Sequence, residues 1–179
     1  MSPAAPPMPA PMPAQMPAEW EPHAATWLAW PHNHKDWPGK FATIPFVYAE
    51  IIRRLAVHER VELLVNDEAA RAKATRVLAQ AGAPLDRVRF HLQPTDRIWM
   101  RDSGCTFTRV DGALQAVKWR FNAWAKYDNW TLDETVGSYM ARETGCPERR
   151  PLARGRRFHR QWLRSRVFED VGGERFVGG

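Results

Sequence analysis

Residues 94–104 have the sequence Pro-Thr-Asp-Arg-Ile-Trp-Met-Arg-Asp-Ser-Gly, the densest run of potential chemistry in the chain. Two carboxylates, two guanidinium groups and an indole fall within the seven residues from Asp96 to Asp102. Asp and Arg are rarely buried unless they are paired, and loops held on a rigid scaffold often carry function. The stretch indicates a functional loop, although a solvated turn with an Asp–Arg pair fits the same residues.

Strand-like segments enclose this loop. Residues 88–92 alternate as a half-buried strand does, and residues 106–110 predict a second strand after the loop. Asp111-Gly112 is a two-residue hairpin signal, so residues 114–121 are expected to return as the antiparallel partner. The polar and aromatic residues 122–130 form a second loop after a strand, which predicts that the two loops meet at one end of a sheet.

The rest of the chain alternates between helix and strand patterns. Asp67 or Asn66 is suited to cap a helix that ends near Gly82, and Thr131 with Glu134 has the spacing of a capping box. The expected elements are a strand over 25–30, a helix over 44–58, a strand over 61–65, a helix over 67–82 and a helix over 131–145. This interleaving predicts a mixed α/β fold.

Composition narrows the classes of protein. The 179 residues suit one domain, and the sequence shows neither a run of apolar residues that could span a bilayer nor a secretory signal pattern. Cys105 and Cys146 have neither metal-ligand spacing nor a disulfide framework, which favours a cytoplasmic protein. His32 and His34 are interpreted as solvated loop residues, because no further ligands follow at a useful spacing.

The two ends of the chain differ from its middle. Residues 1–18 are rich in Pro, Ala and Met and are expected to be a disordered leader. Residues 1–146 contain 17 Lys and Arg against 16 Asp and Glu, whereas residues 147–179 contain 9 against 4. Because the net charge of +6 is concentrated in an aperiodic tail, we expect no specific nucleic-acid site, only non-specific affinity.

Several motifs together resemble one enzyme family. In order and spacing, they resemble the N-terminal part of the agmatine deiminase and bacterial-type peptidylarginine deiminase family over roughly residues 16–153. The stretches that carry the resemblance are Met-Pro-Ala-Glu-Trp-Glu-Pro-His at 16–23, Thr-Trp-Leu-Ala-Trp-Pro at 26–31, Asp-Trp at 36–37, residues 94–104, and Trp-Arg-Phe-Asn-Ala-Trp-Ala-Lys-Tyr at 119–127.

The resemblance implies a fold and a reaction. It implies a pentein-type α/β propeller of five ββαβ blades, of which this chain would supply the first blades. The family hydrolyses a guanidinium group, so that agmatine and water give N-carbamoylputrescine and ammonia, in putrescine biosynthesis. A cysteine thiolate attacks the guanidinium carbon, a histidine handles protons, and the enzyme needs no metal or other cofactor.

The resemblance also implies roles for individual residues. Asp102 matches the aspartate that grips the substrate guanidinium, which suits the paired N–H donors of that group. Trp99 would lie beside the substrate, and Asp96 and Arg101 would support the site. Asn122 and Trp124 are candidates for the pocket wall, with core packing as the alternative for Trp124.

The sequence also departs from the family pattern. The expected Glu-Gly-Gly motif, the Gly-His-x-Asp motif and the late nucleophilic cysteine do not occur, and neither Cys105 nor Cys146 occupies the nucleophile's place. We therefore expect an inactive N-terminal fragment, with residues 19–153 as its folded part and residues 154–179 as a basic tail that is frameshifted or non-native. Exposed blade edges would favour homo-oligomers or aggregation.

Two alternatives to an agmatine deiminase fragment stay open. A peptidylarginine deiminase-type fragment fits the same motifs, because residues that separate the two substrates lie outside them. A non-catalytic module that binds guanidinium ligands through Asp102 and Trp99 also fits.

Overall fold

The computed structural model describes residues 14–18 and 20–150. They form two three-stranded sheets with helices between and beside them, a mixed α/β fold as the sequence predicts. The proposed basic tail and most of the leader lie outside the described residues.

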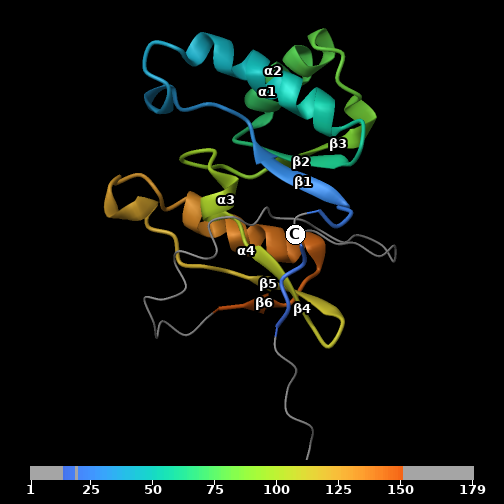
Figure 1. Cartoon of the computed structure of the whole chain (residues 1–179). Helices are drawn as coiled ribbons and strands as arrows, with labels where there is room; N and C mark the ends of the chain where they lie inside the picture. Colours follow the sequence, from blue (N-terminus) through green and yellow to red (C-terminus); the bar gives the residue numbers. More distant parts are fainter. Residues whose placement is uncertain (1–13, 19, 151–179) are drawn as a thin grey trace, which may run out of the picture.

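The first sheet has three parallel strands in the order β1-β2-β3, formed by Ala25–Ala29, Arg60–Val65 and Val88–Leu92. Helices α1 (Ile44–Leu55) and α2 (Glu68–Gln80) connect these strands and cover one face of the sheet (Figure 1). The buried side chains of β2 alternate: Leu63 and Val65 pack under the two helices, whereas Leu64 faces the other side. A parallel sheet needs such cover on both faces.

The second half of the chain has the element order ββαβ after a short helix. Helix α3 (Met100–Ser103) leads into the hairpin of β4 (Thr106–Val110) and β5 (Ala113–Val117), and α4 (Asp133–Thr144) leads into β6 (Glu148–Arg149). Strand β5 pairs antiparallel with β4 and parallel with β6. Asp111 and Gly112 turn the hairpin with φ of 52° and 81°, which confirms the predicted two-residue turn.

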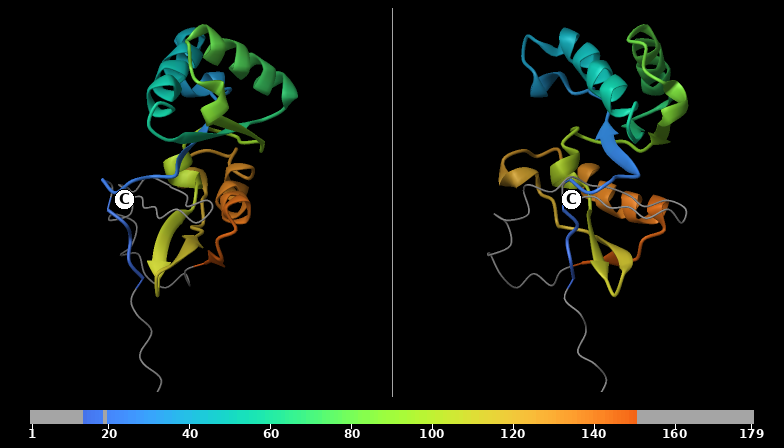
Figure 2. Two further views of the ribbon diagram at one scale, coloured as in Figure 1. Left: turned by 90° about the vertical axis from the view of Figure 1, so that its right-hand side faces the viewer. Right: turned by 45° about the vertical axis from the view of Figure 1, so that its right-hand side comes forward.

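Helix α4 lies between the two sheets (Figures 1 and 2). Its buried side chains Val136 and Met140 belong to one core with Trp27 and Leu64 of the first sheet and Phe107 of the second. The layers are therefore α1 and α2, the first sheet, α4 and the second sheet. The two halves of the chain share one hydrophobic core.

Two sequence predictions about the ends of elements are wrong. The predicted capping box does not form at the start of α4: the N-cap is Leu132 rather than Thr131, and Glu134 instead accepts a hydrogen bond from the Phe121 backbone N–H at 2.6 Å and forms an ion pair with Lys118 at 2.9 Å. The returning strand stops at Val117 rather than residue 121, and the next residue, Lys118, is buried and forms an ion pair with Glu134.

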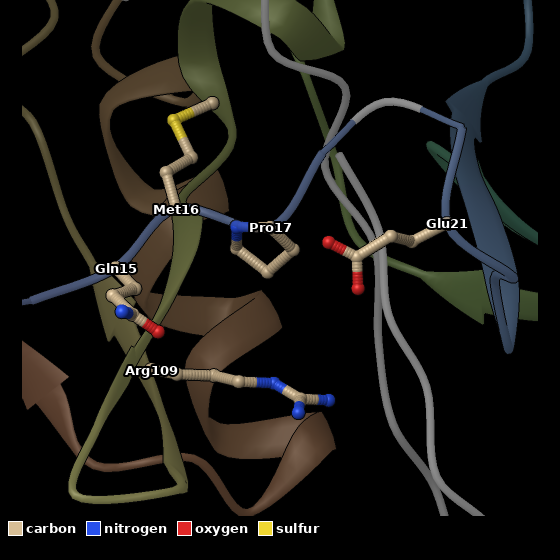
Figure 3. A pocket seen from close by; sticks show the side chains of 5 residues that line it. All are labelled: Gln15, Met16, Pro17, Glu21 and Arg109. Carbon is tan, nitrogen blue, oxygen red and sulfur yellow. The ribbon is translucent and has the colours of Figure 1, made fainter.

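Backbone pairing begins earlier than the boundary expected at Ala18. Gln15 exchanges two backbone hydrogen bonds with Arg109 of β4, at 2.7 and 2.8 Å. Figure 3 shows residues 15–17 running beside β4, with the side chains of Arg109 and Glu21 facing a shared pocket of about 380 Å³. Residues 14–18 thus contact an edge of the second sheet.

Candidate functional site

The start of α4 holds the loop that carries the dense motif. Asp133 is buried, and its Oδ1 accepts the backbone N–H groups of Asp96 at 2.7 Å and Arg97 at 3.1 Å. In return, Asp96 Oδ2 accepts the backbone N–H of Leu132 at 2.9 Å. These reciprocal bonds join the two segments and fix the backbone that leads into α3; among their donors, the N–H of Arg97 is buried and needs such an acceptor.

Burial raises the pKa of the Asp133 carboxyl to about 6, while the two N–H donors act in the opposite direction. The charged form of the Asp133 carboxyl is therefore disfavoured by burial, while its hydrogen bonds hold the backbone of Asp96 and Arg97 in place.

A buried ion pair joins a second loop to the motif. Arg97 contacts Asp36 of the 34–36 turn, with exposed side-chain fractions of 5% and 1%. Arg97 also donates to Asn129 Oδ1 at 3.2 Å, and its guanidinium lies 3.8 Å from the ring centroid of Tyr127. Burial raises the pKa of Asp36, and the charge of Arg97 opposes this shift. Arg97 thereby connects three segments that are far apart in sequence.

Two further contacts tie the 31–36 segment to the motif. His32 Nε2 lies 3.0 Å from Thr95 Oγ1, and the Asn33 side chain donates to the Asp96 carbonyl at 3.1 Å. Burial lowers the pKa of His32, against the opposing charges of Asp36 and Asp96.

The 122–130 loop brings a second indole to the motif. Ala123, Trp124 and Ala125 all have positive φ, of 48°, 58° and 56°, a strained left-handed turn for residues with a Cβ. This turn directs the Trp124 Nε1–H to Asp102 Oδ1 at 3.2 Å. The Trp124 ring packs edge-on against Phe121, with centroids 5.2 Å apart. The two polar loops meet, as the sequence predicts, but they do not lie at one end of a single sheet, because the first follows β3 of one sheet and the second follows β5 of the other (Figure 1).

These loops surround an open groove of about 450 Å³. Trp99 and Trp124 expose 39% and 41% of their surface there, although large aromatic side chains usually lie mostly buried. Trp37 supports Trp99 from the first half, with ring centroids 6.0 Å apart. The residues that line the groove are Lys35, Asp36, Arg97, Trp99, Asp102, Trp124, Lys126 and Tyr127.

The groove contains three of the six predicted site residues. Asp102, Trp99 and Trp124 line it, and Asp96 lies behind it in the hydrogen bonds to α4. Arg101 and Asn122 are exposed and do not line it.

Sequence reasoning assigned no site role to the other residues of the groove. Asp36, Lys126 and Tyr127 lie in stretches that carried the family resemblance, so those stretches held a usable signal. Arg97 lies inside the motif itself. Lys35 had no signal in the sequence, because a single lysine in a polar loop is ordinary.

Within residues 14–18 and 20–150, no group of three or more His, Cys, Asp and Glu side chains is placed to hold a metal ion. Over the same residues, no helix has the length and apolar content needed to cross a membrane.

The sequence profile of the Porphyromonas-type peptidyl-arginine deiminase family matches residues 15–155. The chain belongs to this family. The chain is 35% identical over 126 residues to an agmatine deiminase of Stutzerimonas stutzeri, a match that covers 66% of this chain and 32% of the relative. It is 32% identical over 135 residues to an agmatine deiminase of Pseudomonas syringae pv. tomato, over 72% of this chain and 35% of the relative. The chain thus spans about a third of the length of these deiminases.

Solved agmatine deiminases share the fold. The Enterococcus faecalis enzyme superposes with a TM-score of 0.67 at 21% identity, over 77% of this chain and 38% of that one. A C. jejuni agmatine deiminase with substrate bound superposes with a TM-score of 0.62 at 23% identity, over 76% of this chain and 39% of that one. At these identities the likeness establishes the fold of this deiminase-family chain and not its substrate.

Proposed function

We propose that the groove is the guanidinium-binding part of an agmatine deiminase active site, with Asp102 as the group that holds the substrate. The observation that carries this proposal is the position of the Asp102 carboxylate on a groove lined by the indoles of Trp99 and Trp124. A carboxylate accepts two N–H groups of a planar guanidinium at once, and aromatic faces attract cations. Asp96 and Asp133 hold the loop from behind.

The reaction we propose for the site is hydrolysis of the agmatine guanidinium to N-carbamoylputrescine and ammonia, within cytoplasmic putrescine biosynthesis. A thiolate adds to the guanidinium carbon, ammonia leaves, and water then releases the product from the cysteine. Neither cysteine of the chain lines the groove, and Cys105 is fully buried. We therefore expect that the 179 residues bind the substrate but do not by themselves turn it over.

The ββαβ order of β4, β5, α4 and β6 supports the further proposal that this unit is one blade of a pentein propeller. In such a propeller the strand edges of one blade are protected by the assembled ring. We accordingly propose that the chain on its own associates through unprotected edges.

A second candidate function is favoured by the cations of the groove. Lys35 and Lys126 line it together with Arg97, whereas agmatine is itself a dication with no oxygen for a lysine to contact. A peptidyl-arginine substrate carries carbonyl or carboxylate oxygens that an ammonium group can hold. The groove would then recognise arginine with its backbone rather than agmatine.

Calorimetric titration of the purified chain with agmatine and with N-acetylarginine tests these proposals. Replacing Asp102 by Ala should weaken guanidinium binding by about tenfold to a hundredfold, the value of one hydrogen-bonded charge. Asp128→Ala is the matched control, because Asp128 is exposed on the neighbouring loop and does not line the groove. Equal binding by wild type and Asp102→Ala would refute the assignment of Asp102.

The same titrations separate the candidate substrates. Tighter binding of agmatine supports the agmatine deiminase site. Tighter binding of N-acetylarginine that is lost in Lys126→Ala supports the peptidyl-arginine site. Binding of both ligands without ammonia release fits the non-catalytic module or a fragment that lacks its nucleophile. Ammonia release by the chain alone would contradict the proposed inactivity.

A further inference from the structure

The outer face of α1 is apolar and exposed. Phe46, Val47 and Ile51 on the helix expose 60%, 50% and 41% of their surface, and Val57, just beyond its end, exposes 65%. The opposite face of α1 is already used, because Ala49 and Ile52 are fully buried. The neighbouring helix α2 exposes no large apolar side chain along its length. This difference marks the α1 face as a contact surface.

Four residues form a line along this face. Val47, Glu50 and Arg54 are spaced by three and four positions, which places them on one stripe of α1, and Val57 continues this spacing in the turn that follows the helix. Phe46 and Ile51 lie on either side of the stripe. If a second copy of this stripe runs antiparallel to the first, Val47 of one copy lies opposite Val57 of the other, and Glu50 lies opposite Arg54.

We propose that this face of α1 binds the same face of a second copy of the chain, with the two helices antiparallel. A two-fold axis through the middle of the stripe places Glu50 of each copy opposite Arg54 of the other. It also places Val47 opposite Val57 and adds Phe46 and Ile51 to the buried surface. This arrangement favours a second copy over an unrelated partner, because each copy provides the glutamate for one ion pair and the arginine for the other.

The charges on α1 are already arranged for such an exchange. Glu50 accepts hydrogen bonds at 2.7 Å from both Arg53 and Arg54 of its own helix. Arg54 exposes 74% of its side chain, whereas Arg53 exposes 34%. Arg53 can therefore keep its bond to Glu50 while Arg54 reaches Glu50 of the second copy. The contact does not depend on the proposed guanidinium site, which lies on other loops.

Sedimentation of the full chain over a concentration series tests the proposal. The wild type should form dimers, and Glu50→Arg or Arg54→Glu should each raise the dimer dissociation constant by about tenfold, since two symmetric attractions become repulsions. An equimolar mixture of the two variants should dimerise again. One chain then presents two arginines and the other two glutamates, and these face each other in the antiparallel pair.

Matched controls come from α2, where Glu68 and Arg71 form a similar exposed pair at 3.3 Å. Glu68→Arg and Arg71→Glu should leave the dissociation constant unchanged, and circular dichroism should give each variant a wild-type helix content and melting curve. A wild type that stays monomeric overturns the proposal. So does a failure of the mixed variants to associate, or an oligomer that persists in Glu50→Arg, Arg54→Glu and Ile51→Lys alike.

Discussion

Replacing Asp133 by Asn should change the pH dependence of stability in a defined direction. The pKa of Asp133 is about 6 in the folded chain, against a reference of 3.8, because burial disfavours its charge. The unfolded chain therefore releases this proton first as the pH rises. Between about pH 4 and pH 6 the folded state holds more protons than the unfolded state, so the contribution of Asp133 to the free energy of unfolding falls.

The magnitude follows from the shift. A difference of roughly two pKa units corresponds to about 3 kcal/mol, which is the largest change expected between pH 4 and pH 7. An asparagine at this position would have no charge to bury and would keep an oxygen for the N–H groups of Asp96 and Arg97. The wild type should therefore lose stability relative to Asp133→Asn as the pH rises through this window.

Urea unfolding at pH 4, 5, 6 and 7 measures the difference in free energy of unfolding between the wild type and Asp133→Asn. The other titrating groups are common to both proteins, so their contributions cancel in this difference. Asp133→Ala separates the charge from the hydrogen bonds, because it leaves two backbone N–H groups without their acceptor at a cost of about 1–3 kcal/mol each. That variant should be less stable than Asp133→Asn at every pH. Asp128→Asn is the control: because Asp128 is exposed, this substitution should change the pH dependence of the free energy of unfolding very little. A pH-independent difference between wild type and Asp133→Asn would refute the reasoning.

Three other substitutions test the packing around the site. Gly137→Ala should destabilise the chain by about 1–3 kcal/mol in urea unfolding, despite its better helix propensity, because the new Cβ would lie 2.5 Å from Cδ of buried Lys118. Arg97→Ala should cost about 3–5 kcal/mol in the same assay, since it leaves the Asp36 carboxylate buried without its partner; the double variant with Asp36→Ala should recover part of this loss. Trp124→Phe should weaken calorimetric agmatine binding by about two- to tenfold while the melting curve stays unchanged, because it removes one indole N–H from the exposed groove.

Local patterns in the sequence were sufficient for most of the elements. Asp67 caps α2 through the Ala70 N–H at 2.7 Å, and Gly82 and Gly145 end helices with φ of 71° and 68°, as their residue types predict. These signals succeed because the atoms that decide them lie within four residues. The capping box predicted at Thr131 does not form. Glu134 instead accepts a hydrogen bond from the backbone N–H of Phe121, thirteen residues away, which a local pattern does not encode.

The site followed the same rule. The density of chemistry singled out residues 94–104, and the family resemblance then assigned candidate roles to Trp99 and Asp102 within them, whereas the pairing of Arg97 with Asp36 spans 61 residues and no local pattern encodes it. That Arg101 does not line the groove also depends on tertiary packing, since α3 is only one turn long and local sequence does not decide which of its four side chains faces the loops.

The shortness of α3 explains why the groove needs both halves of the fold. A four-residue helix has too few internal hydrogen bonds to hold its own position. Asp102 is instead placed by what surrounds it: Met100 is buried in the core shared with the first sheet, and Asp133 of α4 fixes the backbone that enters the helix. The 34–36 turn then adds Asp36 to the lining of the groove and is held there by the ion pair of Asp36 with Arg97. Loosening α4 from the first sheet should therefore displace the Asp102 carboxylate even when every residue that lines the groove is intact.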